Sequence, residues 1–303
     1  MIIDSHIHLW PRSLLPDEAV KNYMEPLERA RKELGPEFQE FLDFFLDGAS
    51  PFADYELDVS EIISTMDSNR IDYAVSLGID FGLVNEGRIT NDEYMEWLFR
   101  ECSVDDRLIP FISVDPNRGE EGLRMIERYV KRYDPKGIKM YPATGFYPDE
   151  EKYDRYWDLV DDLGLVVVTH AGMALAPLDE KYCHPVNMAR VAERHPDTKF
   201  IIAHLGGKFS SELPGLMREH ENVYSDCSAM QGWLPRDPGT VISTVSRFVE
   251  EFPDRIVYGS DFPLYEIKYS SMLFIRLLTE SEWGNAKMKD DLMGGNMARI
   301  LGL

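Results

Sequence analysis

The sequence has few cysteines, and none of them are close together in the sequence. Only three occur among 303 residues, at Cys102, Cys183 and Cys227, and no CxxC pair is present. An odd number of widely separated cysteines does not suit the paired framework of a small secreted domain. The cysteine content therefore argues against a disulfide scaffold and favours a reducing, cytoplasmic setting.

Long apolar runs are also missing. No uninterrupted apolar stretch approaches the roughly 20 residues that a membrane-spanning helix needs. The first residues lack the basic start and apolar segment of a signal peptide. We therefore expect neither a membrane span nor a secretion signal.

Positive charge is scarce relative to negative charge. The chain has 32 lysines and arginines against 54 acidic residues, which gives a formal net charge of −22. Nucleic acids and anionic membranes are polyanions, so such an excess argues against both as partners. A small-molecule ligand remains the expected kind of partner.

The first expected strand is not followed by the glycine-rich phosphate loop that doubly wound sheets usually carry. Instead, short apolar strands alternate with helices along the chain. Most of these strands lack an apolar–polar alternation, which is typical of parallel strands buried on both faces. The expected strands span residues 1–8, 71–78, 108–114, 137–141, 165–169, 199–204, 223–227 and 255–258. The expected helices span residues 60–69, 90–102, 119–133, 150–163, 186–195, 211–220, 240–251 and 287–301.

Eight such units predict an α/β fold, the (β/α)8 TIM barrel, as one domain over residues 1–303. The hydrophobic content of 44% is ample for its core. Residues 10–59 interrupt the pattern after the first strand with two helical segments, near 16–34 and 36–46. The second carries an aromatic and aliphatic face at helical spacing. We expect this insertion to form a lid or a subunit interface, and the alternative is a helix packed on the barrel.

Two histidines, His6 and His8, stand two residues apart on the first expected strand. Side chains at positions i and i+2 of a strand point to the same face. Two neutral imidazoles that converge in this way make half of a zinc-type site. Two chance histidines would leave the same pattern, so the rest of the chain has to supply the missing ligands.

Further ionisable residues stand where other expected strands end. Active sites of TIM barrels lie at the carboxyl ends of the strands. Lys139, His170, His204 and Asp261 end the fourth, fifth, sixth and eighth strands. Lone ionisable groups after apolar strands are costly unless they pair or bind something. A set of histidines and an aspartate suits zinc or a similar divalent ion.

These strand ends carry a resemblance to a known family. The pattern is similar to the amidohydrolase superfamily, and specifically to the amidohydrolase-related TIM-barrel branch that includes the aminocarboxymuconate semialdehyde decarboxylase-like enzymes. The resemblance covers the whole chain apart from residues 10–59. The motifs that carry it are Asp4-Ser5-His6-Ile7-His8, Gly137-Ile138-Lys139, Thr169-His170-Ala171-Gly172, Ala203-His204-Leu205-Gly206-Gly207, Gly259-Ser260-Asp261-Phe262-Pro263 and the ending Gly294-Gly295-Asn296-Met297-Ala298-Arg299-Ile300-Leu301-Gly302-Leu303.

The resemblance implies that His6, His8 and His170 bind a metal, with Asp261 as a further ligand or as the base. It implies that His204 lies near the metal, where it orients substrate or water. The chemistry agrees, because a divalent ion with an open position lowers the pKa of water to about 7. Asp261 can then accept the proton, and His204 can donate to a developing oxyanion. One divalent ion is expected, with zinc first and manganese or iron as alternatives.

Lys139 has three possible roles. It can contact the substrate, which we favour. In binuclear members of the superfamily a lysine here is carbamylated and bridges two metals, and His170 and His204 then bind the second ion. The third possibility is a structural lysine paired with a nearby acid.

Other residues have weaker claims. His184 follows the fifth strand, and it either contacts the substrate or belongs to a plain loop. Arg236 follows the seventh strand and could bind a substrate carboxylate through its guanidinium. His195 and His220 are expected near helix ends, where a positive charge is favourable. Asp4 is expected to support a histidine ligand from behind.

The leading functional hypothesis is metal-dependent hydrolysis of a small-molecule amide, lactone or ester by activated water. The alternative is metal-dependent, non-oxidative decarboxylation of a small unsaturated or aromatic acid. A third hypothesis is a catalytically silent barrel that binds a metal or a ligand. The family resemblance also implies a homodimer.

Overall fold

The computed structural model describes residues 1–11, 14, 59–83, 88–174, 178–233, 237–263 and 271–303 of the chain. Nearly all of the insertion at residues 10–59 lies outside these ranges, and so does Arg236. The predicted lid or subunit interface and the predicted role of Arg236 therefore stay predictions.

Eight parallel strands form one sheet in which each strand pairs with the next along the chain. Where β1 meets β8, a single bridge joins Ile7 to Phe262. Backbone hydrogen bonds from Ser5 to Tyr258 and from Asp261 to His6, 2.9 and 2.8 Å long, extend this contact. The sheet is thus a nearly closed barrel, and the predicted TIM-barrel fold is confirmed. The strands are β1 (Ile3–Ile7), β2 (Tyr73–Leu77), β3 (Leu108–Ser113), β4 (Gly137–Met140), β5 (Val166–Thr169), β6 (Phe200–Ile202), β7 (Val223–Asp226) and β8 (Ile256–Val257).

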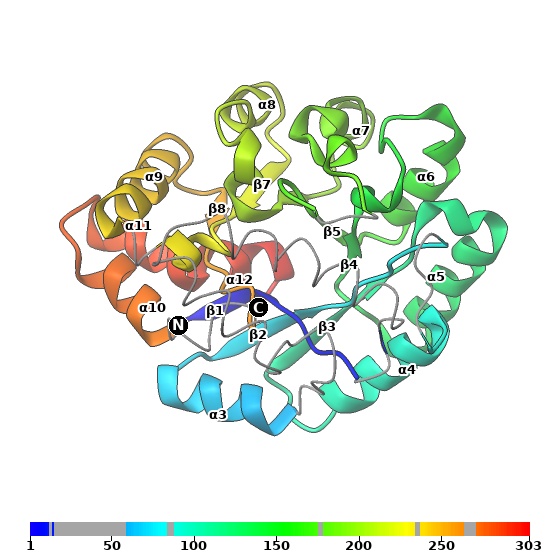
Figure 1. The fold of residues 1–303 in the computed structure, drawn as a ribbon, viewed down its shortest axis with the longest axis horizontal. Coiled ribbons are helices and arrows are strands. Elements are labelled where there is room, and N and C mark those ends of the chain that lie inside the picture. The colour runs from blue at the N-terminus through cyan, green and yellow to red at the C-terminus, as the bar shows by residue number, and fades with distance from the viewer. Residues whose placement is uncertain (12–13, 15–58, 84–87, 175–177, 234–236, 264–270) are drawn as a thin grey trace, which may run out of the picture.

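Helices surround the barrel, as Figure 1 shows. Each of the eight helices expected from residue 60 onward is present, although several are shorter than expected. The two helical segments expected near 16–34 and 36–46 lie outside the described residues. Local chemistry explains some ends: the Thr90 hydroxyl accepts from the backbone of Glu93, and the Glu93 carboxylate accepts from the backbone of Thr90, which fixes the start of α4. The helices are α3 (Val59–Asn69), α4 (Asn91–Cys102), α5 (Gly119–Tyr133), α6 (Asp154–Asp162), α7 (Ala189–Arg194), α8 (Leu213–Glu219), α9 (Pro238–Glu251), α10 (Ser271–Glu280), α11 (Ala286–Asp290) and α12 (Asn296–Leu301).

Two differences from the expected helices have physical reasons. Helix α10 was not expected, although its buried Phe274, Ile275 and Leu278 follow helical spacing. The expected closing helix over residues 287–301 is divided by a π-helical turn, Asp291–Gly295. In that turn Gly294 lies against the start of the chain, where an added Cβ would be 2.6 Å from the Met1 carbonyl oxygen.

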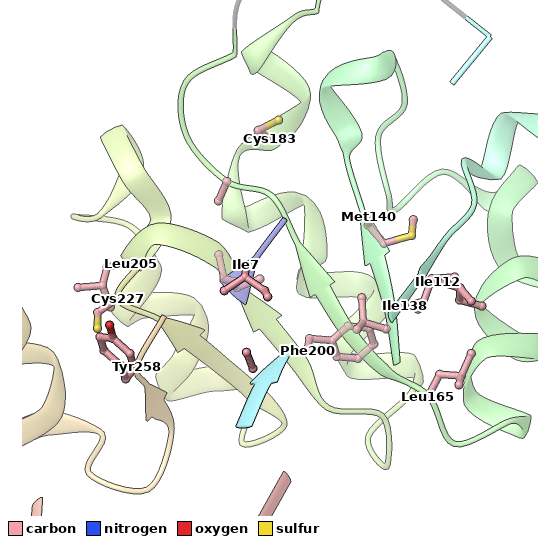
Figure 2. Packing of buried hydrophobic residues seen from close by; sticks show 14 of the residues in the cluster. Ile7, Ile112, Ile138, Met140, Leu165, Cys183, Phe200, Leu205, Cys227 and Tyr258 are labelled. Atoms are coloured by element: carbon pink, nitrogen blue, oxygen red, sulfur yellow. The ribbon is translucent and has the colours of Figure 1, made fainter. Parts of the chain in front are cut away.

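The strands are buried on both faces. In β5, Val166 and Val168 belong to the cluster inside the barrel. Val167 between them belongs to the cluster between the strands and the helices. Figure 2 shows members of this outer cluster, among them Ile138 and Phe200. This double burial explains the apolar strand sequences that predicted parallel strands.

The helix α12 joins the cluster inside the barrel through Met297, Ala298, Ile300 and Leu301. The Asn296 side chain donates to the Ile256 carbonyl oxygen at 2.7 Å, and Lys199 donates to that of Ile300 at 3.2 Å. These contacts lie at the amino ends of β8 and β6, so α12 covers the amino end of the barrel. Over the described part of the chain, no helix is long and apolar enough to cross a membrane.

Candidate metal centre

Three of the predicted site residues bring their ligand atoms together at the carboxyl end of the barrel. His6 lies on β1, His8 follows that strand, and Asp261 follows β8. The Nε2 atoms of His6 and His8 are 3.2 Å apart. The Asp261 Oδ1 atom is 3.5 Å from the first and 3.3 Å from the second. All three side chains are buried.

Hydrogen bonds on the far side of each ring determine which nitrogen is bare. His6 Nδ1 is 2.9 Å from the Asp226 carboxylate, and His8 Nδ1 is 2.9 Å from the Leu77 carbonyl oxygen. Both partners accept hydrogen bonds, so a neutral ring carries its proton on Nδ1 and leaves Nε2 bare. Two bare nitrogens and one carboxylate oxygen thus face one another, an arrangement that calls for a cation.

The charges around this point are strongly affected by burial. Burial, with Lys139 nearby, lowers the pKa of His6 to about 3, so this ring is neutral. Burial alone would raise the pKa of Asp261, but the adjacent His8 side chain and the neighbouring imidazoles hold it well below its usual range. His6 and Asp261 therefore offer a neutral nitrogen and an ionised carboxylate, the protonation states that a metal requires.

Lys139 ends β4 beside the same point, and its Nζ atom is 3.4 Å from His6 Nε2. Its side chain is buried, which lowers its pKa to about 8. A cation or a neutral amine at this position would face any molecule that approaches the centre. The structure thus places Lys139 at the site and leaves its three possible roles open.

His204 reaches the centre from a left-handed turn. The strand β6 ends at Ile202, two residues earlier than expected. His204 and Leu205 then take φ values of 61° and 49°, which cost a residue with a side chain roughly 1–2 kcal/mol. The His204 ring lies 4.9 Å from that of His6, centroid to centroid. Asp261 also has a positive φ, of 60°, so two of the predicted catalytic residues have unfavourable backbone conformations.

Glycines explain how the loops after β5 and β6 come so close. Gly207 has a φ of 56°, and a Cβ there would be 2.8 Å from the Gly172 Cα atom. The two loops therefore touch backbone to backbone. As a result His204 Nε2 is 3.3 Å from His170 Nδ1. These positions account for the glycines that follow each histidine in the motifs.

His170 lies beside these three side chains, but its ring nitrogens fall outside their group of converging atoms. Two groups of ligand atoms within 4.8 Å of one another occur among the described residues, one of His6, His8 and Asp261 and one of His6, His204 and Asp226. His170 Nε2 is 3.0 Å from the Met173 carbonyl oxygen. Burial, with His204 and Lys139 nearby, holds its pKa well below the usual value. Its role as a metal ligand stays a prediction.

The sequence analysis missed two residues of the site, Asp226 and Ser228. Besides His6, the Asp226 carboxylate accepts from the backbone of His204 at 2.9 Å and of Ser228 at 3.0 Å. The Ser228 hydroxyl donates to Asp226 and lies 2.7 Å from His204 Nδ1. Asp226 ends β7. The search for ionisable residues at strand ends would have found it if the weak seventh strand had been included.

Other candidates lie around the centre. Asp4 accepts from the backbone of His6 at 3.2 Å and of Ser260 at 2.9 Å, so it ties together the two segments that carry ligands. The His184 ring accepts from the backbone of Val186 at 3.1 Å and lines a small hollow together with His170. This places His184 near the site, and its contact with substrate stays a prediction.

Aromatic rings lie beside two of these histidines. The Trp10 ring is 6.4 Å from that of His8, and the Tyr141 ring meets that of His170 edge-on at 4.7 Å. Phe81 in turn meets Tyr141 edge-on at 6.0 Å.

The sequence profile of the amidohydrolase family matches residues 3–303. This chain belongs to the amidohydrolase family. Comparison with the curated proteins finds no match.

Solved structures similar to this amidohydrolase share its fold over almost the whole chain. One is 5-carboxyvanillate decarboxylase from Novosphingobium aromaticivorans in complex with manganese, with 17% identity, a TM-score of 0.68 and coverage of 100% and 96% of the two chains. Another is a probable 2-pyrone-4,6-dicarboxylic acid hydrolase from Acinetobacter baumannii, with 14% identity, a TM-score of 0.65 and coverage of 100% and 99%. A third is an amidohydrolase from Burkholderia multivorans with bound zinc, with 16% identity, a TM-score of 0.64 and coverage of 100% and 99%.

The donor atoms of this amidohydrolase fit a divalent ion of the zinc class. Zinc–nitrogen bonds of about 2.0–2.1 Å at a tetrahedral angle place two ligand nitrogens about 3.3–3.4 Å apart. The three distances among His6, His8 and Asp261 span 3.2–3.5 Å. Imidazole and carboxylate donors also suit zinc and manganese. The residues present therefore fit the metal that the family implies.

Proposed function

We propose that this amidohydrolase is a metal-dependent hydrolase of a small-molecule amide, lactone or ester. The observation that carries the proposal is the convergence of two bare imidazole nitrogens and an ionised carboxylate at the mouth of the barrel. His6, His8 and Asp261 would hold the ion, with His170 as a further ligand. A bound divalent ion supplies a Lewis acid and lowers the pKa of water to about 7.

The residues around the ion have separate tasks in this proposal. The Asp261 carboxylate receives a proton from the attacking water. His204 accepts and then donates a proton at its Nε2 atom, beside the substrate carbonyl. Lys139 binds a negatively charged group of the substrate. Trp10 and Tyr141 hold the apolar part of the substrate and keep other water away.

Two measurements test this proposal. Elemental analysis of the purified protein should find about one divalent ion per chain, and the ion should be zinc or manganese. A screen of esters, lactones and amides should then find a substrate that only the metal-loaded protein hydrolyses. Less than about 0.2 ions per chain, unrestored by zinc or manganese, would favour the catalytically silent barrel instead.

A second candidate function is decarboxylation of a small unsaturated or aromatic acid. The buried Lys139 beside His6 favours it, because a cation there would attract a carboxylate. Release of CO2 from enoic or phenolic acids, without turnover of esters, lactones or amides, would replace the hydrolase proposal with this one.

The metal count separates two roles of Lys139. With one ion, His204→Asn should keep the metal and lose turnover. If this variant instead halves a two-metal stoichiometry, Lys139 is the carbamylated bridge and the one-metal proposal fails. Mass spectrometry under native conditions, sensitive to an added CO2, gives an independent answer.

A further inference from the structure

The Ser228 hydroxyl lies behind the candidate centre, within hydrogen-bond distance of three side chains of the site. It is fully buried and lies between two imidazoles and a carboxylate. Its Oγ atom is 2.7 Å from His204 Nδ1 and 3.2 Å from His6 Nδ1, and it donates to Asp226 Oδ1. The hydroxyl has one proton, so it can donate to only one of these three neighbours.

The surroundings of Asp226 decide where this proton goes. The Oδ1 atom of Asp226 already accepts from the backbone N–H groups of His204 and Ser228, which can only donate. Its other oxygen faces His6 Nδ1 at 2.9 Å. An ionised carboxylate has no proton to give, so the Ser228 hydroxyl donates to Asp226.

The same count of protons then determines the tautomer of the His204 ring. Ser228 has no second proton, so its oxygen can only accept from His204, and the proton has to come from Nδ1. A neutral imidazole carries one proton. We infer that Ser228, oriented by Asp226, is a positioning residue that holds neutral His204 with its proton on Nδ1 and leaves Nε2 as an acceptor.

The acceptor atom faces the site. His204 Nε2 is directed at His170 Nδ1, 3.3 Å away. His170 in turn has Nε2 against the Met173 carbonyl oxygen, an acceptor, so a neutral His170 is also bare at Nδ1, and the 3.3 Å contact between the two rings then holds no proton. The competing arrangement puts the proton on His204 Nε2, which satisfies this contact but leaves the Ser228 oxygen without a donor, and the measurement below decides between the two. For the proposed hydrolysis, on which this consequence rests, His204 would accept at Nε2 the proton that Asp261 takes from the attacking water, and would then donate it to the leaving group.

The tautomer of His204 can be measured without any substrate or metal. Protein labelled with ¹⁵N-histidine is recorded by long-range ¹H–¹⁵N NMR, metal-free, at a pH above the usual histidine pKa of about 6.5. Loss of one signal set in His204→Asn assigns that ring. We expect Nδ1–H in the unaltered protein and a shift toward Nε2–H in Ser228→Ala. Ser225→Ala is the control, because Ser225 is also buried on β7 but donates to backbone carbonyl oxygens, those of Ile202 and Asp226.

Two results would overturn the inference: Nε2–H at His204 in the unaltered protein, or Nδ1–H that persists in Ser228→Ala. If Ser228→Ala fails to fold, Ser228→Cys is measured in its place, because a thiol is a weak hydrogen-bond partner. Metal titration adds a second readout. Asp226→Asn should bind zinc 10–100-fold more weakly, roughly the usual loss for such supports, whereas Ser228→Ala should bind it nearly as well as the unaltered protein.

These measurements also separate the inference from the proposed function. A chain that binds no divalent ion but keeps Nδ1–H on His204 would sink the hydrolase proposal and leave the role of Ser228 standing. A chain that binds one ion with His204 in the other tautomer would do the reverse.

Discussion

The two ends of the barrel are built from opposite kinds of side chain. At the amino end, α12 brings Met297, Ile300 and Leu301 to the interior cluster, and all are buried. The buried Asn296 is paired there, because its side chain donates to the carbonyl oxygens of Pro253 and Ile256. This end gains stability from apolar burial.

The carboxyl end contains the energetically unfavourable features of the barrel. It buries His6, His8, Lys139 and Asp261 within a few ångströms of one another. It also holds His204 and Asp261 in left-handed backbone conformations. Buried ionisable groups and strained residues persist where the surrounding structure enforces them, and they cluster at functional sites.

The difference teaches that stability and chemistry are separated along the barrel axis. We expect substitutions at the amino end to change the free energy of unfolding and to spare metal binding. Substitutions of the ligand side chains at the carboxyl end should weaken metal binding and change the free energy of unfolding little.

The largest effect is expected for His8→Ala. Supports behind metal-binding histidines are worth 10–100-fold in affinity, roughly, so the loss of a ligand should weaken metal binding by more than about 100-fold. Isothermal titration with zinc measures this, and circular dichroism should show an intact fold. His220→Ala is the control, since His220 follows α8 beside the amino end of β7. Equal metal affinity in His8→Ala and the unaltered protein would contradict the assigned site.

Next in size is Met297→Ala at the amino end. Met297 is fully buried inside the barrel, and replacing such a side chain by alanine costs about 2–5 kcal/mol. Denaturant unfolding measures the loss, and zinc affinity should stay unchanged. Met272→Ala is the control, because this side chain on α10 is 46% exposed. A large loss of zinc affinity in Met297→Ala would break the separation between the two ends.

The sequence predicted the barrel and most of its strands because both depend on local patterns. Short apolar strands such as Val166–Thr169 record their burial on both faces directly. The ends of the strands were harder to predict. His204 leaves β6 early through a left-handed turn that is held by Asp226, a residue of another strand, and no local pattern contains that contact.

For the candidate site, the rule that ionisable groups end the strands brought His6, His8, Lys139, His204 and Asp261 to one place, as the structure shows. It did not predict that His170 would face His204 while three other side chains converge. That arrangement depends on the contact of Gly172 with Gly207, which joins two loops. The support by Ser228 was out of reach for the same reason, because a hydroxyl shared among three elements leaves no spacing in the sequence.

Gly207→Ala tests that loop contact with a smaller expected effect. Gly119 offers a close control: its φ and ψ are 56° and −134°, against 56° and −126° for Gly207. A Cβ on Gly119 would meet nothing within 4 Å, whereas one on Gly207 would clash with Gly172. The backbone strain of the two alanine variants should therefore nearly cancel. We expect Gly207→Ala to cost about 1–3 kcal/mol more than Gly119→Ala in unfolding free energy, and to weaken zinc binding. Equal losses would show that the loop contact is dispensable.

The smallest effect concerns a buried carboxyl group at the carboxyl end but outside the centre. Burial, with Asp80 nearby, raises the pKa of Asp115 to about 6, although the Thr144 hydroxyl and Arg118 oppose this. Between pH about 4 and about 6 the native protein thus keeps a proton that the unfolded chain has released. The stability that this group contributes is complete below that range and is lost as the pH rises through it.

Asp115→Asn should remove this dependence. The unfolding free energy of the unaltered protein minus that of Asp115→Asn should fall between pH 4 and pH 6, by at most about 1.4 kcal/mol per pH unit. Urea titrations at several pH values measure it, and groups common to both proteins cancel in the difference. A difference that rises with pH would mean that Asp115 is ionised in the native protein. Burial would then destabilise ionised groups only at the metal centre, and not at Asp115 elsewhere on the carboxyl face.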